Sequence, residues 1–334
     1  MKARYLLIAI LFLVVSACQQ NSKYIEDQGF IYGTIYHIKY ESPDGTDFQQ
    51  GIEAEMNRLN HSLSMFDSLS VISKINRNED VVPDDYFLTV FNKAMEVSEI
   101  TGGAFDITVA PMVNAWGFGF KHKEQVTPEL IDSLKKIVGY KKIRISGNKI
   151  IKDHPNTMLD CSAIAKGFAC DIVGKYLAGQ GCKNYMVEIG GEVVAHGINA
   201  KGKCWSIGVS KPVDDPSPME QELKAIVSLN NKALATSGNY RNFYMKDGKK
   251  YAHTIDPHTG FPVQHSLLSS TVLADDCMTA DAFATSFMVL GIEEAEKIVN
   301  RIDGLEAYFI YSGENGEMKT WHSAGFSKML DEKL

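Results

Sequence analysis

Residues 274–285 read ADDCMTADAFAT, a stretch in which a strand is expected to end and a helix to begin. The helix predicted over 278–290 places Asp281 and Thr285 four residues apart, so a carboxylate and a hydroxyl lie on one helix face. Both are hard oxygen ligands, and Mg²⁺ is typically held by one or two carboxylates together with substrate phosphates. The same spacing also occurs on solvated helix faces, so the pair alone leaves both interpretations open.

The segments on either side of this stretch alternate between helix and strand patterns. Further helices are predicted over 48–65, 86–100, 128–138, 163–177 and 293–301. Strands are predicted over 30–40, 157–159, 185–189, 192–196, 204–209, 224–229, 251–255, 269–274 and 307–312, with a hairpin over 143–151 and polar turns over 235–241 and 256–260. Because helices and strands come in mixed order without repeats or a long linker, the predicted fold class is α+β with a mixed sheet.

The N-terminus has the pattern of a targeting segment. Lys2 and Arg4 precede an apolar run over 5–15 that is too short to span a bilayer. Val15-Ser16-Ala17-Cys18 resembles a bacterial lipobox, in which residues 1–17 are removed and Cys18 carries the lipid; an ordinary secretory signal is the alternative. The expected organisation is a signal peptide at 1–17, a lipid-anchored tether at 18–28 and one domain at 29–334, on the periplasmic side of a bacterial membrane.

Charge and cysteine content exclude two classes of protein. The chain has a net charge of −7, which argues against nucleic acid as a partner. Six cysteines occur without a CxxC pair, so a disulfide framework or a structural zinc site is not expected. Most of the cysteines after Cys18 are expected to be buried, with a single disulfide left open.

One segment resembles a phosphate-binding loop without matching it. Residues 197–204 read GINAKGKC, but Cys204 stands where the loop needs a Ser or Thr to reach Mg²⁺. A strand is predicted directly after it, where a phosphate-binding loop leads into a helix. We therefore interpret these residues as a hairpin turn.

Five other segments combine glycines with polar or aromatic residues. They are 101–108 (TGGAFDIT), 159–167 (LDCSAIAKG), 190–192 (GGE), 235–241 (ATSGNYR) and 253–257 (HTIDP). Each has a structural interpretation taken alone: a helix end, a helix cap by Asp160, a bulge, a turn and a structural His253.

In this order the segments resemble the FAD:protein FMN transferase family, also called the ApbE family. The resemblance covers about residues 29–326. It rests on Tyr32-Gly33-Thr34, Ser68 through Ser73 to Asn76, Gly103-Ala104-Phe105-Asp106, Pro111, Trp116-Gly117, Leu159-Asp160 with Ala165-Lys166-Gly167, Gly190-Gly191-Glu192, Thr236-Ser237-Gly238, His253 with Asp256-Pro257-His258-Thr259-Gly260, and Ala280-Asp281-Ala282 with Thr285. It implies an ApbE-like fold with two interleaved lobes around a cleft for FAD and Mg²⁺.

The resemblance also implies an activity and its ligands. Family members use Mg²⁺ to move FMN from FAD onto a Thr or Ser hydroxyl of a target protein, through a phosphoester bond, and release AMP. Asp281, Thr285 and the backbone carbonyl of Ala163 would hold the metal. The residues that would contact FAD are Tyr32, Phe66, Ala104, Phe105, Asp106, Asp160, Lys166 and Ile255. Tyr32 replaces a methionine common in the family.

His253 is the candidate for deprotonating the incoming hydroxyl, because imidazole titrates near neutral pH. Asp256 would either orient His253 or only shape the turn. Acceptors implied by the family are flavoprotein subunits of membrane redox complexes of the Na⁺-pumping NADH:quinone reductase or Rnf type. The alternatives are a Mg²⁺-dependent FAD pyrophosphatase, with water as the acceptor, and a non-catalytic FAD-binding lipoprotein.

Overall fold

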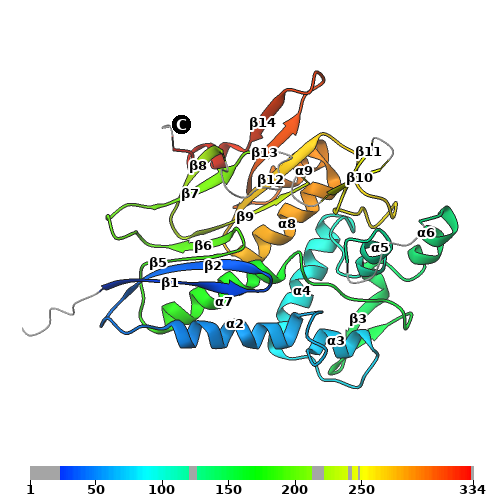
Figure 1. Cartoon of the computed structure of the whole chain (residues 1–334), viewed down its shortest axis with the longest axis horizontal. Coiled ribbons are helices and arrows are strands. Elements are labelled where there is room, and N and C mark those ends of the chain that lie inside the picture. The colour runs from blue at the N-terminus through cyan, green and yellow to red at the C-terminus, as the bar shows by residue number, and fades with distance from the viewer. Residues whose placement is uncertain (1–22, 120–125, 213–221, 240–242, 247–248, 332–334) are drawn as a thin grey trace, which may run out of the picture.

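The fold is built on one eight-stranded sheet, shown in Figure 1 by a computed structural model that describes residues 23–119, 126–212, 222–239, 243–246 and 249–331. The strand order is β1-β2-β5-β6-β9-β12-β13-β14. These strands are β1 (Lys23–Ile31), β2 (Thr34–Ser42), β5 (Tyr185–Ile189), β6 (Glu192–His196), β9 (Lys232–Gly238), β12 (Leu267–Ala274), β13 (Glu306–Ser312) and β14 (Met318–His322). The α+β class is confirmed, but the sheet is not mixed, since every pair within it is antiparallel.

Helices cover one face of this sheet and a hairpin covers part of the other (Figure 1). On the helical side lie α2 (Gln49–Leu63), α4 (Asp85–Ile100), α7 (Ala165–Gly179), α8 (Cys277–Leu290) and α9 (Ile292–Val299). On the opposite side lie β7 (Trp205–Ser210), β8 (Leu223–Leu229) and α10 (Ala324–Ser327). The larger core therefore forms between the sheet and the helices that carry the predicted site residues.

Smaller elements surround these two layers. They are α3 (Val71–Asn76), α5 (Ala110–Ala115), α6 (Pro128–Lys135), a 3₁₀ turn at Tyr140–Lys142, and the hairpins of β3 (Ile143–Ser146) with β4 (Lys149–Lys152) and β10 (Phe243–Lys246) with β11 (Lys249–Ala252). Met112, Trp116, Val138 and Ile255 form a separate small apolar cluster. Among the described residues, no helix combines the length and apolarity needed to cross a membrane.

Helices α7 and α8 pack closely enough to exclude a side chain at Gly167. A Cβ atom there would lie 2.3 Å from the backbone oxygen of Cys277 and 2.8 Å from the Cβ of Asp281. Asp171 of α7 accepts hydrogen bonds from the backbone N–H groups of Cys277 and Met278, each at 2.8 Å. Burial raises the pKa of Asp171 to about 7 even though these hydrogen bonds lower it. The beginning of α8 is thus fixed on α7, which sets the position of Asp281.

Several predicted elements differ from the structure. The strand predicted over 30–40 is a hairpin, because Tyr32 and Gly33 take φ angles of 52° and 76° between β1 and β2. Tyr is rare at such a position, so the sequence gives no ordinary turn signal there. The turn predicted over 235–241 belongs largely to the central strand β9, where Thr236 lies opposite Thr271. The strand predicted over 157–159 is reduced to a single parallel bridge between Val109 and Met158.

Three further predictions concern the start of α6, residues 197–204 and the cysteines. The α6 helix begins as predicted, with the Thr127 hydroxyl accepting a hydrogen bond from the Leu130 N–H at 3.3 Å. Residues 197–204 do not form a hairpin turn, since β6 pairs with β5 and β9 while β7 pairs with β8. They connect the sheet to the β7–β8 hairpin, and a strand follows them. Four of the five described cysteines are buried as predicted, and all five are free thiols. The signal segment and Cys18 lie outside the described residues.

Asn76, which belongs to one of the motifs of the family resemblance, fixes the chain just before Asp160. Its side chain donates to the backbone oxygen of Leu159 at 2.9 Å and accepts from the Leu159 N–H at 2.7 Å. Leu159 is fully buried. We expect Asn76→Ala to lower the free energy of unfolding by about 2–4 kcal/mol, because two backbone groups of a buried residue lose their partners. Denaturant unfolding measures this loss.

The matched control is Asn78→Asp. It removes one exposed hydrogen bond, from the side chain of Asn78 to the Pro155 carbonyl, and keeps a residue type that tolerates the φ of 61°. We expect a change below about 1 kcal/mol for this variant. Equal losses in the two variants would contradict the role given to Asn76.

Candidate active site

The predicted site residues meet in a cavity of about 510 Å³ beside α8. Its walls come from segments that are far apart in sequence: 104–109, 160–166, 190–192, 236–238, 253–257 and 281–289. A second cavity of about 490 Å³ adjoins it, and the two share Phe66, Ser162 and Lys166. The structure therefore brings together residues that the sequence could connect only through the family resemblance.

Most of the predicted residues line these cavities. The first cavity contains Phe66, Ala104, Phe105, Asp106, Asp160, Ala163, Lys166, His253, Ile255, Asp281 and Thr285 on its wall. Tyr32 lines the second cavity. Asp256 is part of neither wall. The roles of these residues stay predictions, and the contacts below show what each one is placed to do.

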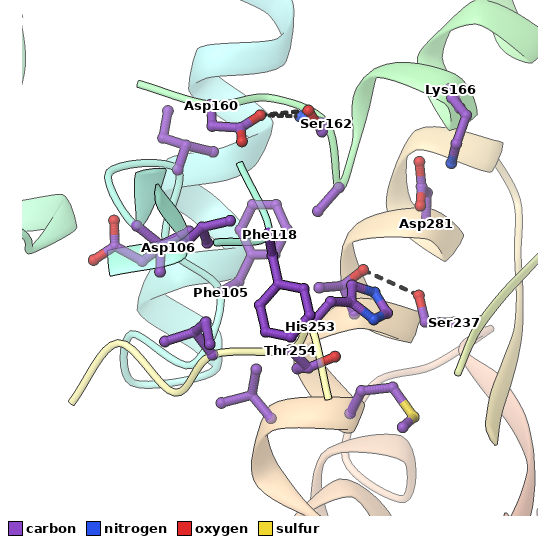
Figure 2. A pocket seen from close by; sticks show the side chains of 18 of the residues that line it. Phe105, Asp106, Phe118, Asp160, Ser162, Lys166, Ser237, His253, Thr254 and Asp281 are labelled. Atoms are coloured by element: carbon purple, nitrogen blue, oxygen red, sulfur yellow. Dashed lines mark hydrogen bonds between the residues drawn. The ribbon is translucent and has the colours of Figure 1, made fainter. Parts of the chain in front are cut away.

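Asp281 and Thr285 form the polar end of the first cavity. Asp281 is 2% exposed, and its Oδ2 accepts a hydrogen bond from the Gly167 N–H at 3.0 Å. Thr285 lies one helical turn further along α8, with its hydroxyl 3.0 Å from the Ser237 hydroxyl of β9 (Figure 2). Burial raises the pKa of Asp281, and the positive charge of Lys166 partly offsets that effect. The chain thus keeps a carboxylate where a negative charge is unfavourable without a cation.

Lys166 and Glu192 add a partly buried ion pair to this end of the cavity. The Lys166 Nζ lies 2.5 Å from Glu192 Oε1, while Glu192 Oε2 is buried without a hydrogen-bond partner among the described residues. Burial raises the pKa of Glu192 to about 7, although the Lys166 charge lowers it. Burial alone would lower the pKa of Lys166, but Glu192 and Asp281 raise it above its usual value. Two acidic groups therefore face one ammonium.

This donor set fits a divalent cation that also binds phosphate. Asp281, the Thr285 hydroxyl and the Ala163 carbonyl are hard oxygen donors on one cavity wall, which suits Mg²⁺. Among the described residues, no cluster of three His, Cys, Asp or Glu side chains is arranged to hold a metal alone. The described residues therefore offer too few charged ligands for a closed metal centre, and a divalent cation here would need substrate oxygens to complete its coordination.

The Asp106 carboxylate is bonded to neighbouring groups of the protein itself. Its Oδ1 accepts hydrogen bonds from the N–H and the hydroxyl of Thr108, at 2.7 and 2.6 Å, and its Oδ2 accepts from the Tyr140 N–H at 2.8 Å. Figure 2 shows this side chain turned away from the labelled residues of the cavity. The carboxylate fixes the loop, and the backbone of 104–106 is left to contact a ligand.

Asp160 does not cap helix α7 as the structural interpretation of its motif predicted, but supports the turn that precedes the helix. Its Oδ1 accepts hydrogen bonds from the N–H of Ser162 at 2.8 Å and from the hydroxyl of Ser162 at 2.5 Å. Helix α7 begins only at Ala165, and its first turn has no side-chain cap. Asp160 therefore lies on the cavity wall, where Oδ2 can accept a hydrogen bond from a ribose hydroxyl or a base.

Two aromatic side chains border the second cavity. Phe66 is 84% exposed and lines both cavities, an unusual position for a large apolar ring unless a ligand covers it. The Tyr32 hydroxyl donates to the backbone oxygen of Met56 at 2.5 Å. This internal hydrogen bond leaves the ring of Tyr32, and not its hydroxyl, to face the cavity in place of the family's methionine.

His253 enters the first cavity, whereas Asp256 belongs to a turn. The ring of His253 lies edge-on to Phe118, with 6.4 Å between ring centres, and Figure 2 shows it in the same cavity as Ser237 and Asp281. Asp256 Oδ1 accepts from the His258 N–H at 2.9 Å and lies 3.2 Å from His258 Nδ1. Of the two roles left open for Asp256, these contacts support the turn, because its carboxylate bonds two residues ahead.

Ser237 and Glu192 contact predicted site residues but were not predicted as site residues. Both belong to motifs of the resemblance, yet residues 235–241 read as a turn and Glu192 as the end of a bulge. Ser237 and Glu192 reach the site through contacts between the sheet and the helices, to Thr285 of α8 and to Lys166 of α7. No local sequence pattern indicates these contacts.

Known proteins resemble the chain over most of its length. The ApbE family model matches residues 32–309. The chain is 38% identical to the FAD:protein FMN transferase of Haemophilus influenzae and 36% identical to that of Vibrio cholerae, over 96% of this chain in both cases and 96% and 97% of those proteins.

Solved structures agree as well. The flavin transferase ApbE from Vibrio cholerae superposes with a TM-score of 0.83 at 36% identity, covering 92% of this chain and all of that one. The apo flavinyl transferase ApbE from Pseudomonas stutzeri gives 0.83 at 30% identity, covering 94% and 98%. The chain belongs to the ApbE family.

Proposed function

We propose that the chain is a Mg²⁺-dependent flavin transferase, which moves FMN from FAD onto a Thr or Ser hydroxyl of a target protein and releases AMP. The observation that carries the proposal is the position of Lys166 at the junction of two cavities, with Asp281 on the wall of the first. FAD has two ring systems joined by a pyrophosphate, so each cavity can take one ring system while Lys166 binds the phosphates between them. The relatives named FAD:protein FMN transferase support the same reaction.

The residues of the cleft have distinct tasks in this reaction. Mg²⁺ held by Asp281, Thr285 and the Ala163 carbonyl would stabilise the charge that develops on the pyrophosphate oxygens. Lys166 binds and orients the pyrophosphate. Phe66 stacks on a ring at the cavity mouth.

The bond changes give His253 its task. The acceptor oxygen forms a bond to the phosphorus on the FMN side, and the bond from that phosphorus to the oxygen of AMP breaks. The hydroxyl proton passes to His253, the imidazole on the cavity wall. The departing AMP takes the negative charge of the broken bond, where Lys166 lies close.

Water could replace the hydroxyl in the same geometry, so an experiment must separate transferase from pyrophosphatase. The protein is incubated with FAD and Mg²⁺, with and without a flavin-accepting domain, and AMP and free FMN are quantified. We expect AMP release to depend on the acceptor, with little free FMN. Equal amounts of AMP and free FMN without acceptor would identify a pyrophosphatase, and uncleaved FAD in both arms would identify a binding protein.

We also propose that the catalytic domain is lipid-anchored through Cys18 on the periplasmic side of a membrane. The support is the lipobox-like sequence before Cys18. Residues 23–28 of the tether predicted over 18–28 belong to strand β1 of the sheet. Acceptors facing the same compartment would be flavoprotein subunits of the Na⁺-pumping NADH:quinone reductase or Rnf type. Mass spectrometry of the N-terminal peptide from membranes tests the anchor; an unmodified Cys18 or an uncleaved N-terminus would contradict it.

A further inference from the structure

Lys166 lies between two carboxylates that both need a cation. Its ammonium contacts Glu192 at 2.5 Å. Asp281 Oδ2 accepts a hydrogen bond at 3.0 Å from the N–H of Gly167, the residue that follows Lys166. Figure 2 shows the Lys166 ammonium and the Asp281 carboxylate facing each other. The lysine is therefore within reach of the same carboxylate that is proposed to bind the divalent cation.

The Gly190-Gly191 turn builds the contact between Lys166 and Glu192. The two glycines form a two-residue hairpin turn between β5 and β6, with φ angles of 66° and 101°. A Cβ atom on Gly190 would lie 2.8 Å from the Cγ2 of Thr34 and 3.4 Å from the Cδ of Lys166, so the stem of the lysine lies beside the turn. Glu192 is the first residue after the turn and points to the ammonium.

Among the ion pairs between described residues, Glu192 is the acidic partner with the least exposed side chain. Its side chain is 6% exposed, whereas the next most buried acid in such a pair is Asp67 at 18%. Burying an ionised carboxylate is costly unless it is paired, so the Glu192–Lys166 contact serves a purpose that a surface pair does not. The orphaned Oε2 atom shows that the pairing is incomplete.

A competition between cations follows from this arrangement. An ammonium and a divalent cation both bind carboxylates, and the attraction is strong where water is scarce. If Lys166 had no partner of its own, the Asp281 carboxylate would be its nearest alternative. An ammonium held there would occupy the carboxylate and repel the incoming divalent cation.

We infer that Glu192 is a positioning residue that holds the Lys166 ammonium away from Asp281 and so keeps the Asp281 carboxylate available for the divalent cation. This inference rests on the proposed function, because it takes Asp281 as a metal ligand. It assigns a task to the Gly190-Gly191-Glu192 motif. The glycines supply the positive φ angles of the turn, and the glutamate fixes the charged end of the lysine.

The test measures divalent cation binding without turnover. Mg²⁺ binding to the purified protein is followed by calorimetry in the presence of saturating AMP, a product that the enzyme cannot cleave. We expect Glu192→Gln to weaken Mg²⁺ binding by roughly 10–100-fold, the range found when residues that support metal ligands are changed. Thermal unfolding and circular dichroism confirm that each variant is folded.

A second substitution distinguishes positioning from direct contact with the metal. Lys166→Met removes the competing ammonium, so adding Glu192→Gln to this background should change Mg²⁺ affinity by less than about 3-fold, a non-additive result expected of coupled residues. An equal loss in both backgrounds would overturn the inference, since Glu192 would then act on the cation itself. Unchanged Mg²⁺ affinity in Glu192→Gln alone would overturn it as well.

Asp275→Asn is the matched control. It breaks the exposed ion pair between Lys232 and Asp275, which has the same 2.5 Å separation and lies just before α8 but outside both cavities. It should leave Mg²⁺ binding unchanged. If the wild-type protein with AMP binds no divalent cation, the metal-dependent function itself fails. If wild type binds and Glu192→Gln binds equally well, only the positioning role fails.

Discussion

Asp281→Ala should abolish Mg²⁺-dependent flavin transfer, with kcat/KM falling at least ~10²–10³-fold, the usual cost of losing one group that stabilises transition-state charge. Asp281 is the one buried carboxylate on the α8 face that also carries Thr285, among the residues that the structure describes. The hydroxyl and the backbone carbonyl that remain are neutral, so they cannot replace its charge. Transfer rates measured over a Mg²⁺ titration test this prediction directly.

Asp281→Asn separates the charge from the fold. The amide oxygen can still accept the hydrogen bond from the Gly167 N–H, so the contact between α7 and α8 is kept. Burial raises the pKa of Asp281, which means that its charged form destabilises the metal-free fold above the ordinary carboxyl pKa. At neutral pH without Mg²⁺, Asp281→Asn should therefore unfold at no lower temperature than wild type while losing transfer. Wild-type transfer by Asp281→Ala at low Mg²⁺ would show that the metal assignment is wrong.

His253→Ala should keep FAD binding and lose transfer. The imidazole is placed to accept the hydroxyl proton, a role worth roughly 10²–10⁴-fold in rate, whereas the FAD contacts come from other segments of the cleft. We expect the FAD dissociation constant, measured by fluorescence, to stay within about 3-fold of wild type, since one imidazole is a small part of the contact surface. Single-turnover transfer to an acceptor domain gives the rate.

His258→Ala is the comparison for the His253 variant. His258 lies five residues further on, is exposed, and bonds Asp256 and the Gly102 carbonyl, so it supports the turn without entering the cavity. Its loss should reduce transfer much less than the loss of His253. Full transfer activity in His253→Ala would remove that histidine from the mechanism, and a weakened FAD affinity equal to the loss of rate would make it a binding residue.

Local sequence signals were sufficient to predict elements whose ends are fixed by a side-chain cap or by the steric restriction of a proline. Thr127 and Pro128 fix the start of α6, and the four-residue spacing on α8 puts Asp281 and Thr285 on one face. The family resemblance supplied the other predicted residues of the cleft, all of which line one of the two cavities except Asp256.

What could not be predicted depends on tertiary contacts. Tyr32 adopts a left-handed conformation that the sheet hairpin imposes, and no local pattern marks it. Residues 235–238 are rich in small polar residues, which favour turns in isolation, but pairing with β12 makes them part of a central strand. That strand places Ser237 against Thr285. Glu192 becomes a site residue only because the Gly190-Gly191 turn brings it to Lys166.

Mass spectrometry of an acceptor domain co-expressed with this protein tests the central claim most directly. The protein is expected to add one FMN, with loss of water, to a single Thr or Ser of the acceptor through a phosphoester bond. Co-expression with the Asp281→Ala variant should leave the acceptor unmodified, as should replacing the acceptor's Thr or Ser by Val or Ala. An unmodified acceptor beside active wild-type protein that cleaves FAD to FMN and AMP would contradict the assignment as a transferase.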